Sequence, residues 1–352
     1  MIKDSVRGVV VTAQTITHLI RILTEALFIS PLNNLRGVVG RLRDLRRPTG
    51  PYSELDLIQV RNLRGIWRLF EYFLEVFLLP FGLKRRFDNY YKRESDSSGP
   101  ELIHIDSGSA FEDERWIYIN GVATNEDVAR LNAQCIVALF QRPITIVCNP
   151  TGSLLPDLIE VTAQKAFYQR RRTARRALEF IRAELHKTEV RRVILLAHSQ
   201  GAVIAAQIVR ALRTDLNRPE SELGKLEIYT FGNPADSMQY VRAPAGPKPG
   251  LPYMEHFANT GDLVARLGVL AMKARTRGDI NIDGPVYVCN RFGHFFNEHY
   301  LHSLELGMYT PMNESDSGRA TQSNFEARDK LKSSSARLCG YMHGARPMNR
   351  SF

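Results

Sequence analysis

Hydrophobic residues change their spacing along the chain near residue 100. Before it, residues 17–28 and 66–86 carry apolar side chains at helical spacing. After it, short apolar runs alternate with helical patterns. The runs lie at 115–121, 143–150, 191–199, 225–234, 253–262 and 284–294, and the helical patterns at 125–141, 170–187 and 202–212. Strands that alternate with helices predict an α/β fold, with a mainly parallel sheet covered by helices on both faces.

A polar, Ser- and Gly-containing linker at residues 92–100 divides the chain. We expect a helical N-terminal extension at 1–99, an α/β domain at 100–311, and a polar, Ser-rich tail at 312–352 that is disordered. The stretch 66–86 contains charged residues and ends in proline and glycine, which makes it too short to cross a bilayer. It fits either a helix that packs on the core or a peripheral membrane contact through residues 64–86.

Charge and cysteine content indicate which partners and which cellular location to expect. The net charge of +10 comes largely from clusters at 41–47, 84–86 and 170–176, outside the predicted strands. Such clusters fit solvated faces or attraction to an anionic membrane, and no nucleic-acid signature accompanies them, so we expect no nucleic-acid partner. The four cysteines form no CxxC pair, and no secretory signal pattern opens the chain. We expect an intracellular protein, cytoplasmic or peripheral to a membrane, and not a secreted one.

Ser199 is the first candidate for chemistry. It lies in Ala-His-Ser-Gln-Gly between the apolar run Val193–Leu196 and the helical pattern 202–212. A serine on a sharp strand-to-helix turn presents its hydroxyl and aims the next backbone N–H groups at the same point. The turn needs small residues two positions either side, here Ala197 and Gly201. This pattern predicts a nucleophile, and the alternative is an inert loop serine.

Three segments together resemble a known family. "LLAHSQGA" looks like the nucleophile elbow of α/β-hydrolases, and "YTFGNP" followed by "ANTGDLVARL" is similar to the later strands of class 3 lipases and related intracellular serine esterases. The resemblance covers about residues 115–308. It implies an α/β-hydrolase-type fold and the order serine, aspartate, histidine along the chain.

The resemblance implies that Asp262 is the acid, since it is the first carboxylate in the matching context. Asp236 is the rival acid, one strand earlier. We favour His294 as the base because it directly follows a predicted strand and Gly293, with His299 as the alternative base. The aromatic that often follows the histidine in the lipase pattern would favour His299, which Tyr300 follows.

Other groups complete the candidate site. Backbone N–H groups of Gln200 and of Val122 or Ala123 are the expected oxyanion donors, with a plain turn at Gly121 as the alternative for the second. His198 is expected to be a fixed part of the turn whose side chain points away from Ser199.

No cofactor is expected, because phosphate-binding glycine loops, dinucleotide fingerprints and metal motifs are absent from the sequence. A metal site from His294, His299 and His302 has suitable spacing but no accompanying carboxylate or cysteine cluster.

These residues predict a serine hydrolase that cleaves a carboxylic ester through an acyl-enzyme on Ser199. Apolar residues within 149–169 would suit a hydrophobic acyl group, so the expected substrate is lipid-like. An acyltransferase that uses the same serine, and a non-catalytic binding module on a hydrolase fold, remain open. The sequence does not predict an oligomeric state.

Overall fold

The computed structural model describes residues 52, 54, 102–108, 111–121, 126–148, 172–214, 220–240, 251–273, 281–312 and 336–348. The predictions for the N-terminal helices, for the membrane contact at 64–86 and for the apolar segment 149–169 lie outside these residues.

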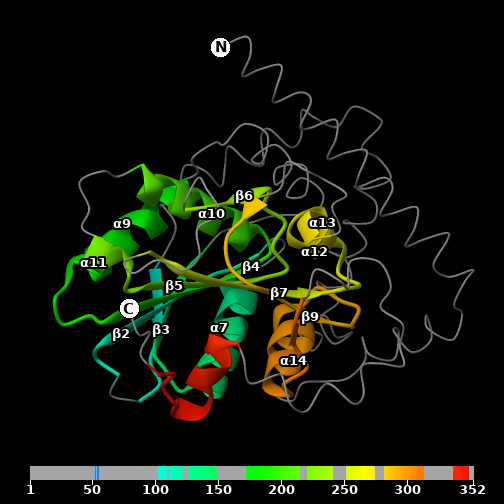
Figure 1. The fold of residues 1–352 in the computed structure, drawn as a ribbon. Coiled ribbons are helices and arrows are strands. Elements are labelled where there is room, and N and C mark those ends of the chain that lie inside the picture. Colours follow the sequence, from blue (N-terminus) through cyan, green and yellow to red (C-terminus); the bar gives the residue numbers. More distant parts are fainter. Residues whose placement is uncertain are drawn as a thin grey trace, which may run out of the picture.

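A mainly parallel sheet forms the centre of the described part of the chain (Figure 1). Its spatial order is β1-β3-β2-β4-β5-β7-β9-β10; the six inner strands pair in parallel, and the edge strands β1 and β10 pair antiparallel. The strands are β1 (Leu102–Ile105), β2 (Glu114–Ile119), β3 (Ile144–Val147), β4 (Arg192–His198), β5 (Leu226–Phe231), β7 (Tyr253–Asn259), β9 (Val286–Cys289) and β10 (Thr310–Pro311). The short strands β6 (Ser237–Met238) and β8 (Asn281–Ile282) form a separate parallel pair.

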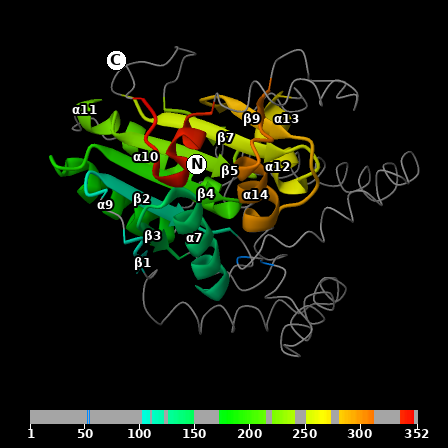
Figure 2. The same ribbon diagram turned by 90° about the horizontal axis from the view of Figure 1, so that it is seen from below.

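Helices cover both faces of this sheet, as Figure 1 shows edge-on and Figure 2 from below. One face carries α9 (Arg172–His186), α10 (Gln200–Arg213), α11 (Glu220–Leu223), α12 (Leu263–Leu267) and α13 (Val269–Lys273). The other carries α7 (Glu126–Phe140), the π-helix η4 (Phe296–Leu301), α14 (His302–Glu305) and the 3₁₀ segment η8 (Arg337–Gly344). The predicted fold class, a mainly parallel sheet with helices on both faces, is confirmed.

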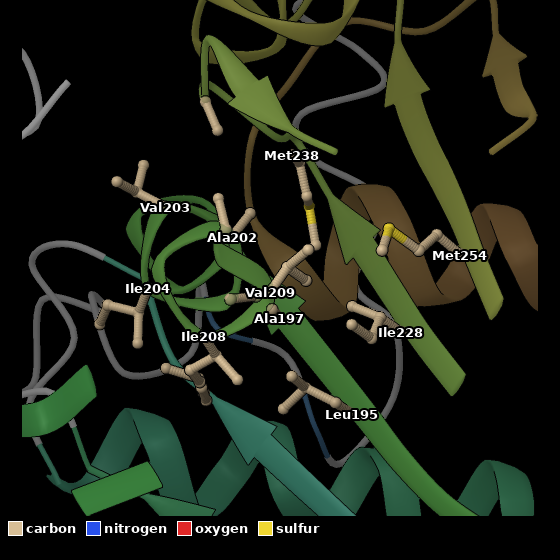
Figure 3. Close-up of a cluster of buried hydrophobic side chains, with 14 of the residues drawn as sticks. Leu195, Ala197, Ala202, Val203, Ile204, Ile208, Val209, Ile228, Met238 and Met254 are labelled. Carbon is tan, nitrogen blue, oxygen red and sulfur yellow. The ribbon is translucent and has the colours of Figure 1, made fainter. Parts of the chain in front are cut away.

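Two apolar cores follow from the alternation of side chains along the buried strands. In β4, Leu195 and Ala197 belong to the core under α9 and α10, whereas Ile194 and Leu196 belong to the core under α7 and η4. Figure 3 shows the first core, where Val209 of α10 lies beside strand residues of β4 and β5. Each such buried aliphatic side chain contributes about 1.5–3 kcal/mol to folding. A central strand buried on both faces is therefore continuously apolar.

The prediction of a disordered tail at 312–352 is wrong for residues 336–348. Leu338 and Tyr341 are buried in the core with α7 and α14. Arg337 donates two hydrogen bonds to the buried Glu227, and its backbone N–H donates to Glu255. The polar composition concealed these few anchors, whose partners lie about a hundred positions earlier in the chain.

Candidate active site

Ser199 lies on a sharp turn between β4 and α10. Its φ of 55° and ψ of −121° are strained for a residue with a side chain. The turn is held by the Ser199 N–H, which donates to the Phe231 carbonyl at 2.9 Å. A Cβ added at Gly201 would lie 2.3 Å from the Ile119 carbonyl oxygen, so only glycine allows α10 to start this close to β2. The local geometry is that of a nucleophile elbow.

Asp262 follows β7 and caps the first turn of α12. Its Oδ1 accepts a hydrogen bond from the Val264 N–H at 2.8 Å, and a Cβ added at Gly232, directly after β5, would lie 2.8 Å from its Oδ2. The residue is 1% exposed. A carboxylate buried this deeply needs hydrogen-bond donors on both oxygens.

His294 lies between Ser199 and Asp262 and contacts both. Its Nδ1 lies 2.7 Å from Asp262 Oδ2, and its Nε2 lies 2.8 Å from Ser199 Oγ. A neutral imidazole that donates from Nδ1 to the carboxylate presents an acceptor lone pair on Nε2 to the serine hydroxyl. The structure thus brings together Ser199, Asp262 and His294 in the arrangement of a catalytic triad.

The rival residues do not take the place of Asp262 or His294 in these hydrogen bonds. Asp236 precedes β6, where its carbonyl accepts from the Asn281 N–H. His299 and His302 lie in η4 and α14, as expected for the last helix, and His302 Nδ1 is 3.9 Å from Glu305. Within the described ranges, no group of three or more His, Cys, Asp or Glu residues is arranged to hold a metal ion.

The structure describes one of the two expected oxyanion donors, the N–H of Gln200. Gln200 is the first residue of α10, so its N–H lies at the positive end of the helix dipole, next to Ser199. Gly121 follows β2, and a Cβ placed on it would be 2.8 Å from Ser199 Cβ. The loop after β2 therefore passes directly beside the serine, although Val122 and Ala123 lie outside the described residues.

Two further side chains contact the triad and were not predicted to do so. The Tyr300 hydroxyl donates to Asp262 Oδ2, the oxygen that also accepts from His294. His198 Nε2 donates to the His294 carbonyl at 2.9 Å, and burial, with the nearby His294, holds the pKa of His198 well below its usual value. In the sequence, Tyr300 was noted only as the aromatic after the alternative base His299, and His198 only as part of the elbow. Neither observation identified a hydrogen-bond partner.

A hollow in the described part of the chain lies away from this site. Its volume is about 770 Å³, and Glu114, Trp116 and Arg191 are among its lining residues, near the amino ends of β2 and β4. In parallel sheets, catalytic groups gather at the carboxyl ends of the strands, where Ser199 lies. We therefore do not assign the substrate to this hollow.

No family model matches this chain, and no curated protein matches it. A search of solved structures finds similarity to a crystal structure of a hormone-sensitive lipase from a metagenome library. The identity is 13%, the match covers 60% of this chain and 84% of the other, and the TM-score is 0.32. A likeness this weak carries no argument, so the fold rests on strand order and the site on its own geometry. Among the described helices, none is long and apolar enough to cross a membrane.

Proposed function

We propose that this protein is a serine hydrolase that cleaves a carboxylic ester through an acyl-enzyme formed on Ser199. One observation carries the proposal: His294 lies between Ser199 Oγ, at 2.8 Å, and the buried Asp262 Oδ2, at 2.7 Å. An inert loop serine needs neither an imidazole acceptor nor a buried carboxylate behind it. The strained backbone at Ser199 supports the same role, because strain of this kind persists where function requires it.

Acylation follows from this geometry. Ser199 Oγ attacks the ester carbonyl carbon while its proton passes to His294 Nε2. Asp262 holds the imidazole in the tautomer that accepts this proton and stabilises the imidazolium that forms. The tetrahedral intermediate then collapses: the C–O bond to the alcohol breaks, and His294 returns the proton to the departing oxygen.

Deacylation reverses the roles. A water molecule gives its proton to His294 Nε2 and attacks the acyl carbon, and Ser199 leaves with that proton as the acid is released. Two backbone N–H groups would stabilise the oxyanion of both intermediates. One is the N–H of Gln200, and we assign the other to Val122 in the loop after β2. Each backbone donor of this kind typically lowers the barrier by about 2.7–4 kcal/mol.

The test is labelling by a fluorophosphonate, in which an Oγ–P bond forms and fluoride leaves. We expect wild type to be labelled, and Ser199→Ala and His294→Ala not to be. Asp262→Asn should slow labelling on the order of 10⁴-fold, because the wrong imidazole tautomer is then held. Asp236→Asn and His302→Ala are matched controls that should label like wild type. A folded wild type that does not label would contradict the proposal and favour a binding module.

The substrate class is proposed from sequence. The apolar residues of 149–169 and the basic-ended stretch 64–86 favour a hydrophobic acyl group presented near a membrane. The rate constant kcat/KM for p-nitrophenyl esters should then rise from acetate to octanoate, and the protein should sediment with anionic vesicles more than with neutral ones. A preference for acetate would remove the hydrophobic part of the proposal and leave the hydrolase intact. Product analysis with an added alcohol separates hydrolysis from acyl transfer.

A further inference from the structure

The segment that carries His294 is held at each of its three residues by a side chain from elsewhere. We call residues 293–295 the base loop. The carbonyl of its first residue accepts from Asn259 Nδ2 at 3.3 Å, and the carbonyl of its second accepts from His198 Nε2 at 2.9 Å. The N–H of its third residue donates to His299 Nδ1 at 2.9 Å. These three backbone groups, which no strand pairs, thereby keep fixed hydrogen bonds.

His299 contacts this loop through both its backbone and its side chain. It lies one turn into η4, and its own N–H donates to the Phe295 carbonyl at 3.1 Å. Its side chain reaches back to the Phe295 N–H, so two hydrogen bonds join the same two residues in opposite directions. A first-turn side chain that accepts from the N-cap N–H is one half of a capping box, and it ties the first turn of the helix to the preceding chain.

The His299 ring also packs on the other end of the base loop. A Cβ added at Gly293 would lie 2.4 Å from His299 Nδ1 and 2.5 Å from Cγ and Cε1, and Gly293 has a φ of 117°. The Phe295 ring stacks on the same imidazole, with centroids 5.4 Å apart and planes 15° apart. Both neighbours of His294 therefore touch one imidazole ring.

This contact requires an uncharged ring. Since Nδ1 accepts from a backbone N–H, the single proton of a neutral imidazole lies on Nε2. His299 is 1% exposed, and burial, with the Arg291 cation nearby, lowers its pKa to about 4. Within the described residues nothing hydrogen-bonds to Nε2, so this ring leaves one buried donor unsatisfied while its other nitrogen holds the base loop.

We propose that His299 is a positioning residue for His294: its neutral ring, through the acceptor Nδ1 and through contact with Gly293, holds the base loop so that Nε2 of His294 stays within reach of Ser199. The inference rests on the proposed function for its effect on rate, while the positioning itself is a property of the fold. It gives the alternative base of the sequence analysis a different task. Mispositioning a catalytic group by about 1 Å can cost on the order of 10²-fold in rate.

The test compares two replacements of similar size. His299→Asn keeps an acceptor oxygen near the position of Nδ1, whereas His299→Leu keeps the apolar volume and removes the acceptor. His299→Leu should lower kcat and the fluorophosphonate labelling rate by about 10- to 100-fold with KM nearly unchanged. His299→Asn should recover most of this loss. The control His302→Leu, one turn further along, should behave as wild type.

A second readout does not depend on activity. The proton on His294 Nδ1, hydrogen-bonded to Asp262, should give a low-field ¹H resonance in wild type and His299→Asn, and a broadened or missing one in His299→Leu. If wild type shows this resonance but does not label, the proposed function fails. The positioning inference is then tested by the resonance alone, compared between wild type and the two variants. Should His299→Leu not fold, His299→Gln replaces it, since its amide lies beyond Nδ1. Equal behaviour of the acceptor-lacking variant and wild type in both assays would overturn the inference.

Discussion

Replacing Tyr300 by phenylalanine removes one hydroxyl from the site and little else. That hydroxyl donates to Asp262 Oδ2 and accepts, at 3.4 Å, from the Asn259 N–H. The ring is fully buried and packs edge-on against Phe231, with centroids 6.0 Å apart. Because Tyr300→Phe keeps these ring contacts, its effect reports the two hydrogen bonds of the hydroxyl, of which the one to the charged carboxylate is the stronger.

The magnitude follows from the donors around Asp262. The carboxylate accepts from the Val264 N–H, His294 Nδ1 and the Tyr300 hydroxyl, and it is almost entirely excluded from solvent. A hydrogen bond to a charged partner contributes about 1.5–3 kcal/mol. We therefore expect Tyr300→Phe to lower the free energy of unfolding by about 1.5–3 kcal/mol. If about 1.4 kcal/mol of this is lost from the transition state for acylation, labelling slows about tenfold.

The assay pairs urea denaturation with the rate of fluorophosphonate labelling. Tyr118→Phe is the matched control, because this buried hydroxyl accepts at 3.1 Å from the neutral amide of Asn132 and does not touch the triad. The control should lose about 1 kcal/mol and label at the wild-type rate. A Tyr300→Phe protein as stable and as reactive as wild type would refute the assignment of the hydroxyl to Asp262.

Three further predictions concern strain, the C-terminal segment and pH. Ser199→Gly should unfold with a free energy about 1 kcal/mol higher than that of Ser199→Ala, because glycine adopts the φ of 55° without strain; equal stabilities in urea would contradict the strain. Arg337→Met should cost about 3 kcal/mol by leaving Glu227 buried without its cation, and should open residues 336–348 to limited proteolysis; an unchanged digestion pattern would count against this anchor. Burial raises the pKa of Glu54 from 4.5 to about 7, with Glu298 as a nearby like charge, so the folded state holds this proton more tightly than the unfolded state. Stability from this group is full below pH 4.5 and is lost as pH rises to 7, and Glu54→Gln should flatten that slope in urea titrations; a slope unchanged by the substitution would show that another group titrates.

Periodicity was enough to predict the parallel strands of the sheet and its longer helices. The apolar run at 191–199 corresponds to β4, and the basic helical pattern at 170–187 corresponds to α9. In central strands and amphipathic helices, the buried positions determine the spacing of apolar residues, so the spacing predicts the element. Strand β1 was not predicted, since Leu102–Ile105 is a short, half-exposed edge strand without a clear pattern. The packing of residues 336–348 was missed because it depends on pairing with distant buried carboxylates.

The candidate site was predictable as far as the order of its groups. Ser199, Asp262 and His294 each follow a strand, and a parallel sheet brings the carboxyl ends of its strands together. The sequence favoured His294 but kept His299 as the alternative base, because both lie within a few residues of the last predicted strand. That choice depends on where η4 begins: the helix starts at Phe296, which leaves His294 in the loop against Ser199 and places Tyr300 against Asp262.

The central claim is tested most directly by trapping the acyl-enzyme. The protein is mixed with a p-nitrophenyl ester, quenched in acid within the first turnover, and digested for mass spectrometry. We predict a burst of p-nitrophenol equal to the enzyme concentration and an added acyl mass on the peptide that contains Ser199. This acyl mass should be missing in Ser199→Ala. An acyl group on another residue, or ester turnover that continues in folded Ser199→Ala protein, would contradict the account.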